Sequence, residues 1–341
     1  MKPSEKPTET CVVTGGAGFI GSHLVERLLR DGHRVRVLDN FSTGQPENLE
    51  AVKAHPQVRI ERVDIADHPD LGPLFEGAAW VFHLAALADI VPSIERPRDY
   101  FRANVVGTER VLEAARSTGV SRLVYAASSS CYGIPEECPT PETAPIRPQY
   151  PYALTKRLGE ELVLHWGLTY RMPVVSLRFF NVYGPRARTS GTYGAVFGVF
   201  LAQKLNGKPF TVVGDGTQTR DFTYVTDVVE ALVRAAESDE IRGEVFNVGS
   251  GNTYSINRLV ELLGGEVVHI PKRPGEPDCT FADISNIRRR LGWEPRVRFE
   301  DGVRRMLEHV EDWRKAPVWT PEAIATATQD WFRYLSPSEV A

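Results

Sequence analysis

The sequence predicts an α/β protein built on a doubly wound parallel sheet, because short apolar runs alternate with helical patterns as far as residue 184. The runs are nearly continuous in apolar residues, as expected for strands that helices cover on both faces. A glycine-rich turn at residues 15–21 directly follows the first run and opens a helical pattern. Such a turn at a strand–helix junction is typical of a Rossmann-type nucleotide-binding sheet.

The expected strands of this sheet lie at residues 11–14, 34–39, 58–65, 80–87, 122–129 and 173–184. The expected helices between them lie at residues 23–32, 99–119 and 152–167. The first helix has Leu24, Leu28 and Leu29 on one face and ends at Gly32, as an amphipathic helix that packs on a sheet should.

Beyond residue 184 the composition changes, and loops rich in Pro, Gly and Arg separate shorter elements. These are expected helices at 194–206, 226–238 and 255–264 and expected strands at 210–215 and 244–249. The sequence therefore predicts three parts, with a cleft between the second and the third. They are a loose polar tail at 1–10, a sheet domain at 11–184 with a return segment around 222–248, and a smaller C-terminal α/β substrate lobe formed mainly by 185–341.

Composition excludes several classes of function. The net charge is -4, so the chain has no basic field that would attract nucleic acid. No apolar run is long enough to cross a bilayer, and the first ten residues do not resemble a signal peptide. We expect no metal site and no disulfide framework, because Cys11, Cys131, Cys138 and Cys279 lack CxxC spacing. A reducing cytoplasm is the expected compartment.

The glycine-rich turn predicts a dinucleotide site. Gly15, Gly18 and Gly21 allow a tight turn, the close approach of a pyrophosphate and the packing of helix against strand. The N-terminus of the following helix would offer unpaired N–H groups to that pyrophosphate. Asp39 ends the second strand 24 residues after Gly15, where a carboxylate binds the ribose 2′-hydroxyl and repels a 2′-phosphate. The expected cofactor is therefore NAD rather than NADP.

A candidate acid–base pair follows in the third predicted helix. Tyr152 and Lys156 are spaced i and i+4, so their side chains share one helix face. A lysine cation beside the phenol, together with an oxidised nicotinamide, is expected to lower the tyrosine pKa toward working pH. Such pairs also occur on many surface helices without any function. Ser128, at the end of the strand at 122–129, would place a hydroxyl at the sheet edge where ligands of such folds bind.

These motifs resemble, in order, those of the extended short-chain dehydrogenase/reductase family of sugar-nucleotide epimerases and dehydratases. The matching segments are TGGAGFIGSH, DNFSTG, HLAA, ANVVGT, YALTK and RFFNVYGPR, within a resemblance that spans residues 10–300. The resemblance implies Tyr152 as the base, Lys156 as its partner and Ser128 as the hydroxyl that assists at the sugar oxygen. It also implies that NAD is held by Gly15, Gly18, Phe19, Ile20, Gly21, Asp39, Asn40, Ser42, Thr43, Gly44, Asp64, Ile65, Leu84, Ala85, Ala86, Asn104, Tyr152 and Lys156.

The resemblance further implies a nucleoside-diphosphate sugar as substrate. Arg220 and Arg273 match arginines that bind the diphosphate, a task that suits guanidinium groups. Asn181 would bind the sugar nucleotide, and the small Thr280 would leave room for an N-acetyl group, as in UDP-GlcNAc and UDP-GalNAc. Arg186 and Arg188 would border the substrate loop. Helices 99–119 and 152–167 would pair across a two-fold axis, as a four-helix bundle, in a homodimer.

The predicted reaction is C4 epimerisation through a transient 4-keto sugar. Related 4,6-dehydratases carry carboxylates directly after the strand hydroxyl, whereas this chain has Ser129, Ser130 and Cys131 there. A dehydratase or another sugar-nucleotide modifier remains the alternative, and a non-catalytic NAD-binding scaffold and a simple alcohol dehydrogenase are further ones. Asp89 is an unexpected carboxylate near the sugar site. It could be a plain loop residue, a contact to an unusual sugar, or a displaced acid.

Overall fold

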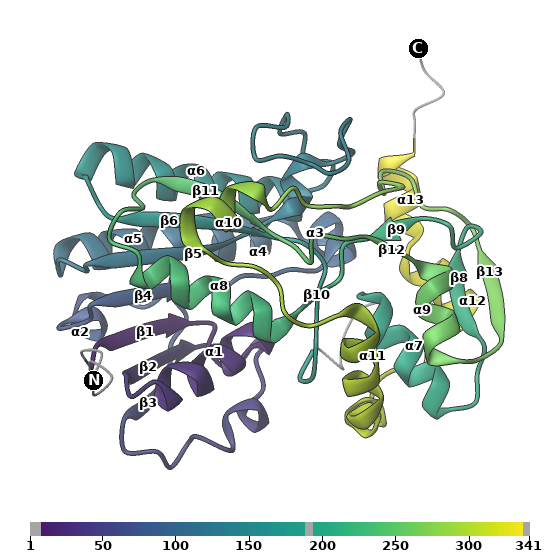
Figure 1. The fold of residues 1–341 in the computed structure, drawn as a ribbon, viewed down its shortest axis with the longest axis horizontal. Coiled ribbons are helices and arrows are strands. Elements are labelled where there is room, and N and C mark those ends of the chain that lie inside the picture. Colours follow the sequence, from purple (N-terminus) through teal and green to yellow (C-terminus); the bar gives the residue numbers. More distant parts are fainter. Residues whose placement is uncertain (1–7, 188–193, 337–341) are drawn as a thin grey trace.

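A seven-stranded parallel sheet forms the larger part of the molecule (Figure 1). The computed structural model describes residues 8–187 and 194–336. Along the sheet the strand order is β11-β6-β5-β4-β1-β2-β3, so the chain reverses its direction of travel between β1 and β4. The strands are β1 (Thr10–Thr14), β2 (Arg34–Asp39), β3 (Val58–Arg62), β4 (Trp80–His83), β5 (Arg122–Ser128), β6 (Val174–Phe179) and β11 (Glu244–Val248). This order confirms the Rossmann-type doubly wound sheet.

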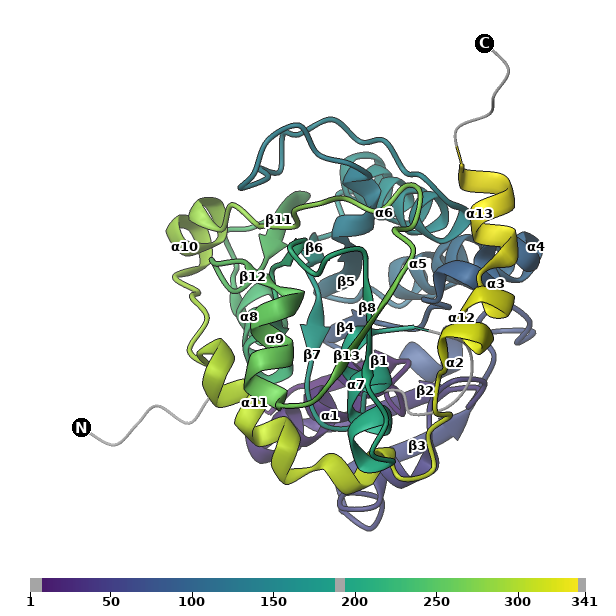
Figure 2. The same ribbon diagram turned by 90° about the vertical axis from the view of Figure 1, so that its right-hand side faces the viewer.

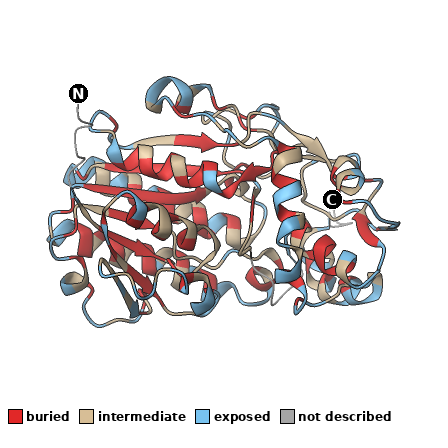
Figure 3. Cartoon of the chain, turned by 60° about the horizontal axis from the view of Figure 1, so that its bottom comes forward, coloured by how far each residue is buried: buried red, intermediate tan, exposed pale blue. Residues whose placement is uncertain are grey.

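Helices cover both faces of the sheet. On one face α1 (Phe19–Arg30) packs against α8 (Val225–Glu237), and on the other α5 (Gly107–Ser117) packs against α6 (Pro151–Tyr170) (Figure 1). Strands β1, β4, β5 and β6 are almost entirely buried between these layers, and Figure 3 shows the buried residues filling the sheet and the helix faces turned toward it. Burial on both faces explains why these strands are nearly continuous in apolar residues.

A smaller lobe with its own aromatic core lies beside the carboxyl ends of the strands (Figure 2). Its sheet pairs β8 (Phe210–Val213) with β13 (Val267–Ile270). Around this pair lie α7 (Val196–Leu205), α9 (Ile256–Leu263), α11 (Phe299–Glu308) and α12 (Pro321–Ala327). By contrast, α10 (Ser285–Leu291) packs on β11 of the main sheet, and α13 (Gln329–Leu335) packs on α3 (Ile90–Glu95). Short pairs β7 (Val182–Tyr183) with β10 (Thr223–Tyr224) and β9 (Thr219–Arg220) with β12 (Tyr254–Ser255) join the lobe to the main sheet.

Several predicted elements are shorter than expected. The segment predicted as one helix at 99–119 is three: α4 (Pro97–Phe101), a π-helical turn at Arg102–Val106 and α5. Periodicity could not separate them, because a π-helical turn adds only one residue to the hydrogen-bonded ring. Strand β4 ends at His83, and the four residues expected to continue it line a cavity instead. The remaining elements are α2 (Gly72–Phe75), α3 (Ile90–Glu95) and short 3-10 turns at Pro46–Leu49, Ser129–Tyr132 and Val310–Trp313.

The expectation about cysteines was wrong. Cys138 and Cys279 form a disulfide, whereas Cys11 and Cys131 are buried thiols. The bonded pair is separated by 141 residues, so no local spacing could reveal it. The disulfide joins the loop between β5 and α6 to the segment that carries Thr280. The same loop and segment are also paired by an isolated β-bridge between Thr140 and Ala282. Cysteine usage therefore no longer supports a reducing compartment, and cytoplasmic localisation stays a prediction.

We expect loss of this disulfide to destabilise the chain. A cross-link over a long loop removes conformations from the unfolded state and typically contributes about 2–4 kcal/mol. Cys138→Ser should lower the free energy of unfolding by this amount, measured by urea titration under oxidising conditions. A thiol reductant should produce the same loss in the wild type and no further loss in the variant. A wild-type stability that does not respond to reductant would contradict the prediction.

Candidate active site

One large cavity lies between the carboxyl ends of the strands and the smaller lobe. Its volume is about 1140 Å³, and both parts of the chain line it. All of the predicted cofactor and substrate residues line this cavity except Asn104. The sequence therefore identified the walls of the site, although their contacts with ligands stay predictions. Arg186 also lines it and pairs with Glu26, whereas Arg188 lies outside the described residues.

The glycine-rich turn brings the backbone close to the cavity floor. Gly15 has φ of +71° and lies very close to the loop that follows β4. A Cβ atom on Gly15 would be 2.7 Å from the Ala85 nitrogen. At Gly21 a Cβ atom would be 2.2 Å from the Gly15 oxygen, so only glycine permits this packing of α1 on the turn. No side chain caps the start of α1, so its first N–H groups have no side-chain acceptor there, and the first residues of the helix, Phe19–Gly21, line the cavity. This cradle fits a dinucleotide pyrophosphate.

Asp39 lies at the end of β2 beside the turn. Its carboxylate accepts hydrogen bonds from the Ala17 N–H at 2.9 Å and the Phe41 N–H at 2.8 Å. Burial raises its pKa above the ordinary value, and these two hydrogen bonds oppose the rise. The two backbone donors hold the side chain in place, so its charge has a fixed position at the cavity wall. That position fits a ribose diol and disfavours a 2′-phosphate.

Further along the same wall, the predicted residues Asp64 and Asn40 contact each other. Asp64 also contacts Arg102, a cation that the sequence did not reveal. It accepts hydrogen bonds from Asn40 Nδ2 at 3.0 Å and from Arg102 Nη2 at 3.0 Å. Arg102 also pairs with Asp67. The π-helical turn places Arg102 at the cavity, opposite the expected adenosine end. Only the fold could show this contact, since 38 residues separate the partners.

The candidate acid–base pair lies where α6 meets the end of β5. Lys156 is buried, with Nζ 4.3 Å from the centre of the Tyr125 ring, and burial lowers its pKa to about 7. Burial raises the pKa of the half-buried Tyr152, and a hydrogen bond with Ser128 opposes this rise. The sequence predicted a lowered Tyr152 pKa, whereas the chain without its cofactor raises this pKa. The cost of removing a phenolate from water outweighs the stabilising contacts that the chain provides.

Ser128 is set up to act on the same ligand atom as Tyr152. Its backbone ends β5, and its Oγ lies 2.8 Å from Ser130 Oγ and accepts the Ser130 N–H at 3.2 Å. Both hydroxyls face the cavity. Phenol and hydroxyl therefore converge from a helix and from a strand on one region, as deprotonation of a substrate hydroxyl requires.

Asn104 supports this region from behind instead of lining it. Its Oδ1 accepts the Leu87 N–H at 2.8 Å, and its Nδ2 donates to the Leu87 oxygen at 2.9 Å and to Thr155 Oγ1 at 3.0 Å. It is 1% exposed, so it is a positioning residue. It joins the cavity loop after β4 to the helix of Tyr152. Its assignment as a cofactor-binding residue is not supported by this placement.

The residues expected at the substrate diphosphate gather around Glu276. Arg273 Nη1 lies 3.0 Å from its carboxylate, and Arg220 Nη2 lies 3.9 Å from it. Arg220 also donates to the Thr219 and Pro277 oxygens at 2.9 Å, and burial lowers its pKa. Two guanidinium groups with one carboxylate leave a local excess of positive charge. Such a site suits a diphosphate, and Glu276 holds both cations in place.

Thr280 and Asn181, predicted separately, contact each other. Thr280 Oγ1 donates to Asn181 Oδ1 at 2.8 Å and accepts the Asp221 N–H at 3.2 Å. Asp221 is fully buried, and burial raises its pKa to about 6. It accepts the Ser250 and Ala282 N–H groups, so it anchors the segment that carries Thr280. The disulfide at Cys279 anchors the same segment.

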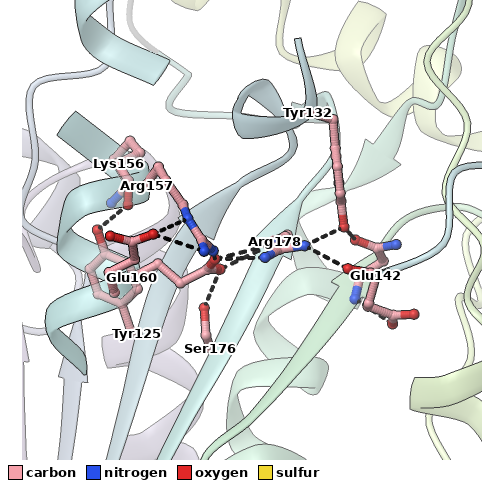
Figure 4. Close-up of polar contacts among 10 residues, drawn as sticks. Tyr125, Tyr132, Glu142, Lys156, Arg157, Glu160, Ser176 and Arg178 are labelled. Atoms are coloured by element: carbon pink, nitrogen blue, oxygen red, sulfur yellow. Dashed lines mark hydrogen bonds and ion pairs between the residues drawn. The ribbon is translucent and has the colours of Figure 1, made fainter. Parts of the chain in front are cut away.

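A buried ion pair underlies α6, the helix that carries Tyr152 and Lys156 (Figure 4). Glu160, one turn after Lys156 on α6, is 1% exposed and pairs with Arg178 of β6 at 2.7 Å. Ser176 donates to the same carboxylate at 2.8 Å, and Arg178 donates to the Tyr132 hydroxyl at 2.7 Å. Despite burial, which alone would raise it, these contacts lower the pKa of Glu160. The pair fixes α6 on the sheet, and the sequence analysis missed it.

Residues 8–187 and 194–336 lack two kinds of feature. Among them, no group of three or more His, Cys, Asp or Glu side chains could hold a metal ion. Over the same residues, no helix has both the length and the apolar character needed to cross a bilayer.

Comparisons with known proteins identify the family of the chain. Residues 11–249 match the model of the NAD dependent epimerase/dehydratase family. UDP-glucose 4-epimerase of Mycolicibacterium smegmatis is 39% identical, over 87% of this chain and 97% of that protein. The solved UDP-N-acetylglucosamine 4-epimerase of Methanobrevibacter ruminantium is 34% identical, with a TM-score of 0.84, over 90% of this chain and 98% of that one. The UDP-glucuronic acid 4-epimerase of Bacillus cereus, solved with NAD, is 33% identical, with a TM-score of 0.83, over 89% and 99%.

Proposed function

The chain belongs to the NAD dependent epimerase/dehydratase family, and from that premise we propose that it interconverts UDP-GlcNAc and UDP-GalNAc by C4 epimerisation. It is an NAD-dependent enzyme acting on sugar nucleotides. The observation that carries the finer proposal is the convergence of Tyr152 and Ser128, beside buried Lys156, in a cavity that Arg220 and Arg273 also line. A diphosphate bound at the arginines would extend its sugar toward the phenol.

In the proposed mechanism Tyr152 accepts the proton of the C4 hydroxyl while Ser128 hydrogen-bonds to the same oxygen. Lys156 lies one turn further along the helix, where its charge favours the phenolate. Bound NAD supplies the hydride acceptor and donor at its nicotinamide. The arginines retain the diphosphate while the 4-keto sugar turns over, and Tyr152 returns the proton. The same residues therefore serve both directions of the reaction.

A 4,6-dehydratase is the alternative reaction within this family. It needs a positioned acid beside C5 and C6, and the residues after Ser128 offer only Ser129, Ser130 and the buried thiol of Cys131. This composition favours the epimerase. Simple alcohol oxidation would release NADH, whereas the proposed reaction returns the hydride to the sugar. A non-catalytic scaffold would not need the acid–base set at all.

The decisive experiment incubates the purified chain with NAD and either UDP-GlcNAc or UDP-GalNAc and follows the sugar by proton NMR. We expect an equilibrium mixture of the two sugars from either direction and no stoichiometric gain of NADH absorbance. Loss of the H5 signal with a new methyl signal would instead identify the dehydratase. Absence of any change with UDP sugars would overturn the proposal.

Thr280 is proposed to admit the N-acetyl group because its side chain is small. We expect Thr280→Tyr to lower kcat/KM for UDP-GlcNAc by about tenfold or more, since a ring there would occupy the space of the acetamide. UDP-glucose turnover should be affected much less. Thr280→Ser, which keeps the hydroxyl that contacts Asn181, is the matched control and should retain both activities. An equal loss for both sugars in Thr280→Tyr would contradict this role.

We also propose a homodimer formed through α6 and the helical segment predicted at 99–119, which the structure divides into α4, the π-helical turn and α5. A hollow on this face is lined by Phe101, Val105, Leu158 and Leu162 together with Glu161 and His165. Leu154, one turn before Leu158 on α6, is 47% exposed. Apolar side chains along one face of a helix are typical of a helix-bundle interface. Leu154→Glu should convert a dimer of 38.0 kDa chains into monomers in sedimentation experiments. Val267→Glu, on the exposed strand β13, should leave the mass unchanged. A monomeric wild type would overturn the proposal.

A further inference from the structure

The sugar end of the cavity contains a carboxylate that the proposed mechanism does not use. Asp89 lies in the loop between β4 and α3 and lines the cavity together with Tyr152 and Ser128. It precedes the first residue of α3, yet its side chain makes no capping hydrogen bond to that helix. Capping of α3 therefore does not explain an aspartate at this position.

The backbone fixes Asp89 close to the candidate base. Its N–H donates to the Tyr100 hydroxyl at 3.2 Å. Tyr100 is 2% exposed, and its ring packs edge-to-face on that of Tyr152, with ring centres 6.4 Å apart. Asn104 holds Leu87, two residues earlier, against α6. The carboxylate is thus carried by a loop that is held at Leu87 and at the Asp89 N–H, within electrostatic reach of the Tyr152 phenol.

The chemistry of the substrate decides what such a carboxylate does. The C4 hydroxyl must reach Tyr152, and the C6 group is attached to C5, the neighbouring ring carbon. In a neutral hexose that group is a hydroxymethyl, which can donate a hydrogen bond to a carboxylate. In a hexuronate it is a second carboxylate. Asp89 would repel this C6 carboxylate. The C6 carboxylate would also compete with Asp89 for any cation or hydrogen-bond donor at this end of the cavity.

We propose that Asp89 is a specificity-determining residue that selects UDP sugars with a neutral C6 group and rejects UDP-hexuronates. This inference rests on the proposed function, because it assumes that the sugar reaches Tyr152 with its C4 hydroxyl. It narrows that function, since it excludes a substrate class that the fold, the cofactor site and the diphosphate site would all accept. It does not require Asp89 to take part in proton transfer.

The test compares kcat/KM for UDP-GlcNAc and UDP-glucuronate in the wild type and in Asp89→Asn, which has nearly the same shape without the charge. Charge repulsion over a few ångströms in a partly buried site corresponds to about tenfold or more in rate. We expect the ratio of UDP-glucuronate to UDP-GlcNAc activity to rise by at least this factor in the variant. Glu50→Gln, which removes a charge from an exposed pair with Lys53, should leave the ratio unchanged.

A second measurement separates a charge effect from a change in shape. The pH at which kcat for UDP-GlcNAc reaches half its maximum should fall in Asp89→Asn, since the charge of Asp89 helps to raise the pKa of Tyr152. A purely structural role would not move it.

The outcomes distinguish the two proposals. If UDP-GlcNAc is epimerised but Asp89→Asn leaves the substrate ratio unchanged, the role of Asp89 is refuted and the proposed function stands. A wild type that epimerises UDP-glucuronate as readily as UDP-GlcNAc refutes the role of Asp89 in the same way. If the wild type converts neither sugar, both proposals fall.

Discussion

Tyr152→Phe is expected to lower kcat for epimerisation by about 10²- to 10⁴-fold, the usual contribution of a positioned acid–base group. The change removes only the hydroxyl that hydrogen-bonds with Ser128, so the ring contacts with Tyr100 and Tyr150 remain. KM for the sugar nucleotide should therefore change much less than kcat. Steady-state kinetics with NMR detection would measure both.

The structure provides a matched control for this variant. Tyr150 stacks on Tyr152 with ring centres 6.4 Å apart and lines the same cavity, but it lies before the start of α6. Tyr150→Phe should retain most of the activity. Because burial raises the pKa of Tyr152, wild-type kcat should rise with pH through the neutral range, and this rise should vanish from the residual activity of Tyr152→Phe. Unchanged turnover in Tyr152→Phe would show that another group is the base.

Arg178→Met is expected to give the largest loss of stability, about 3–5 kcal/mol in the free energy of unfolding. Arg178 and Glu160 are 3% and 1% exposed, and removal of the guanidinium leaves a buried carboxylate with only Ser176 and the partly exposed Arg157 as partners. The hydroxyl of Tyr132 also loses its donor. Urea unfolding followed by circular dichroism would measure the change.

Two further variants test the cause of this loss. Arg314→Met breaks the surface ion pair between Arg314 and Glu311, in which the two side chains are 66% and 61% exposed. This change should lower the free energy of unfolding by less than about 1 kcal/mol. The double variant Glu160→Leu with Arg178→Met should be more stable than Arg178→Met alone, since it removes the uncompensated charge. If the double variant is no better, lost packing rather than the stranded carboxylate explains the effect.

The sequence predicted the parts of this molecule that depend on neighbours in the chain. The turn at Gly15–Gly21 and the pair Tyr152 and Lys156 each lie within a few residues, so their spacing alone defines their geometry. The sheet followed from the alternation of elements and the general rules of parallel topology. The local motifs and the sheet could be predicted because local conformation and tertiary packing require the same residues at these positions.

The parts that could not be predicted are contacts across long sequence separations. Nothing near Glu276 indicates that Arg220 will share it, and Cys138 gives no sign of its bond to Cys279. Asn104 was recognised as belonging to the site, but only the π-helical turn shows that it supports the wall from behind. Patterns in a single sequence indicate helix faces, strand faces and turns. The roles of these residues depend instead on contact partners that are far away in the sequence.

The return of the chain to the main sheet has a consequence for synthesis and engineering. Strand β11 completes the edge beside β6, and α8 packs beside α1 on one face of the sheet, yet both are made after α7 and β8 of the smaller lobe. On the ribosome, the first six strands must therefore wait with an open edge until residue 248 has emerged. For the same reason a segment such as 185–341 cannot be exchanged between relatives as an independent cassette. A chimera would import a foreign edge strand and a foreign helix beside α1, so recombination points belong on either side of α8 and β11.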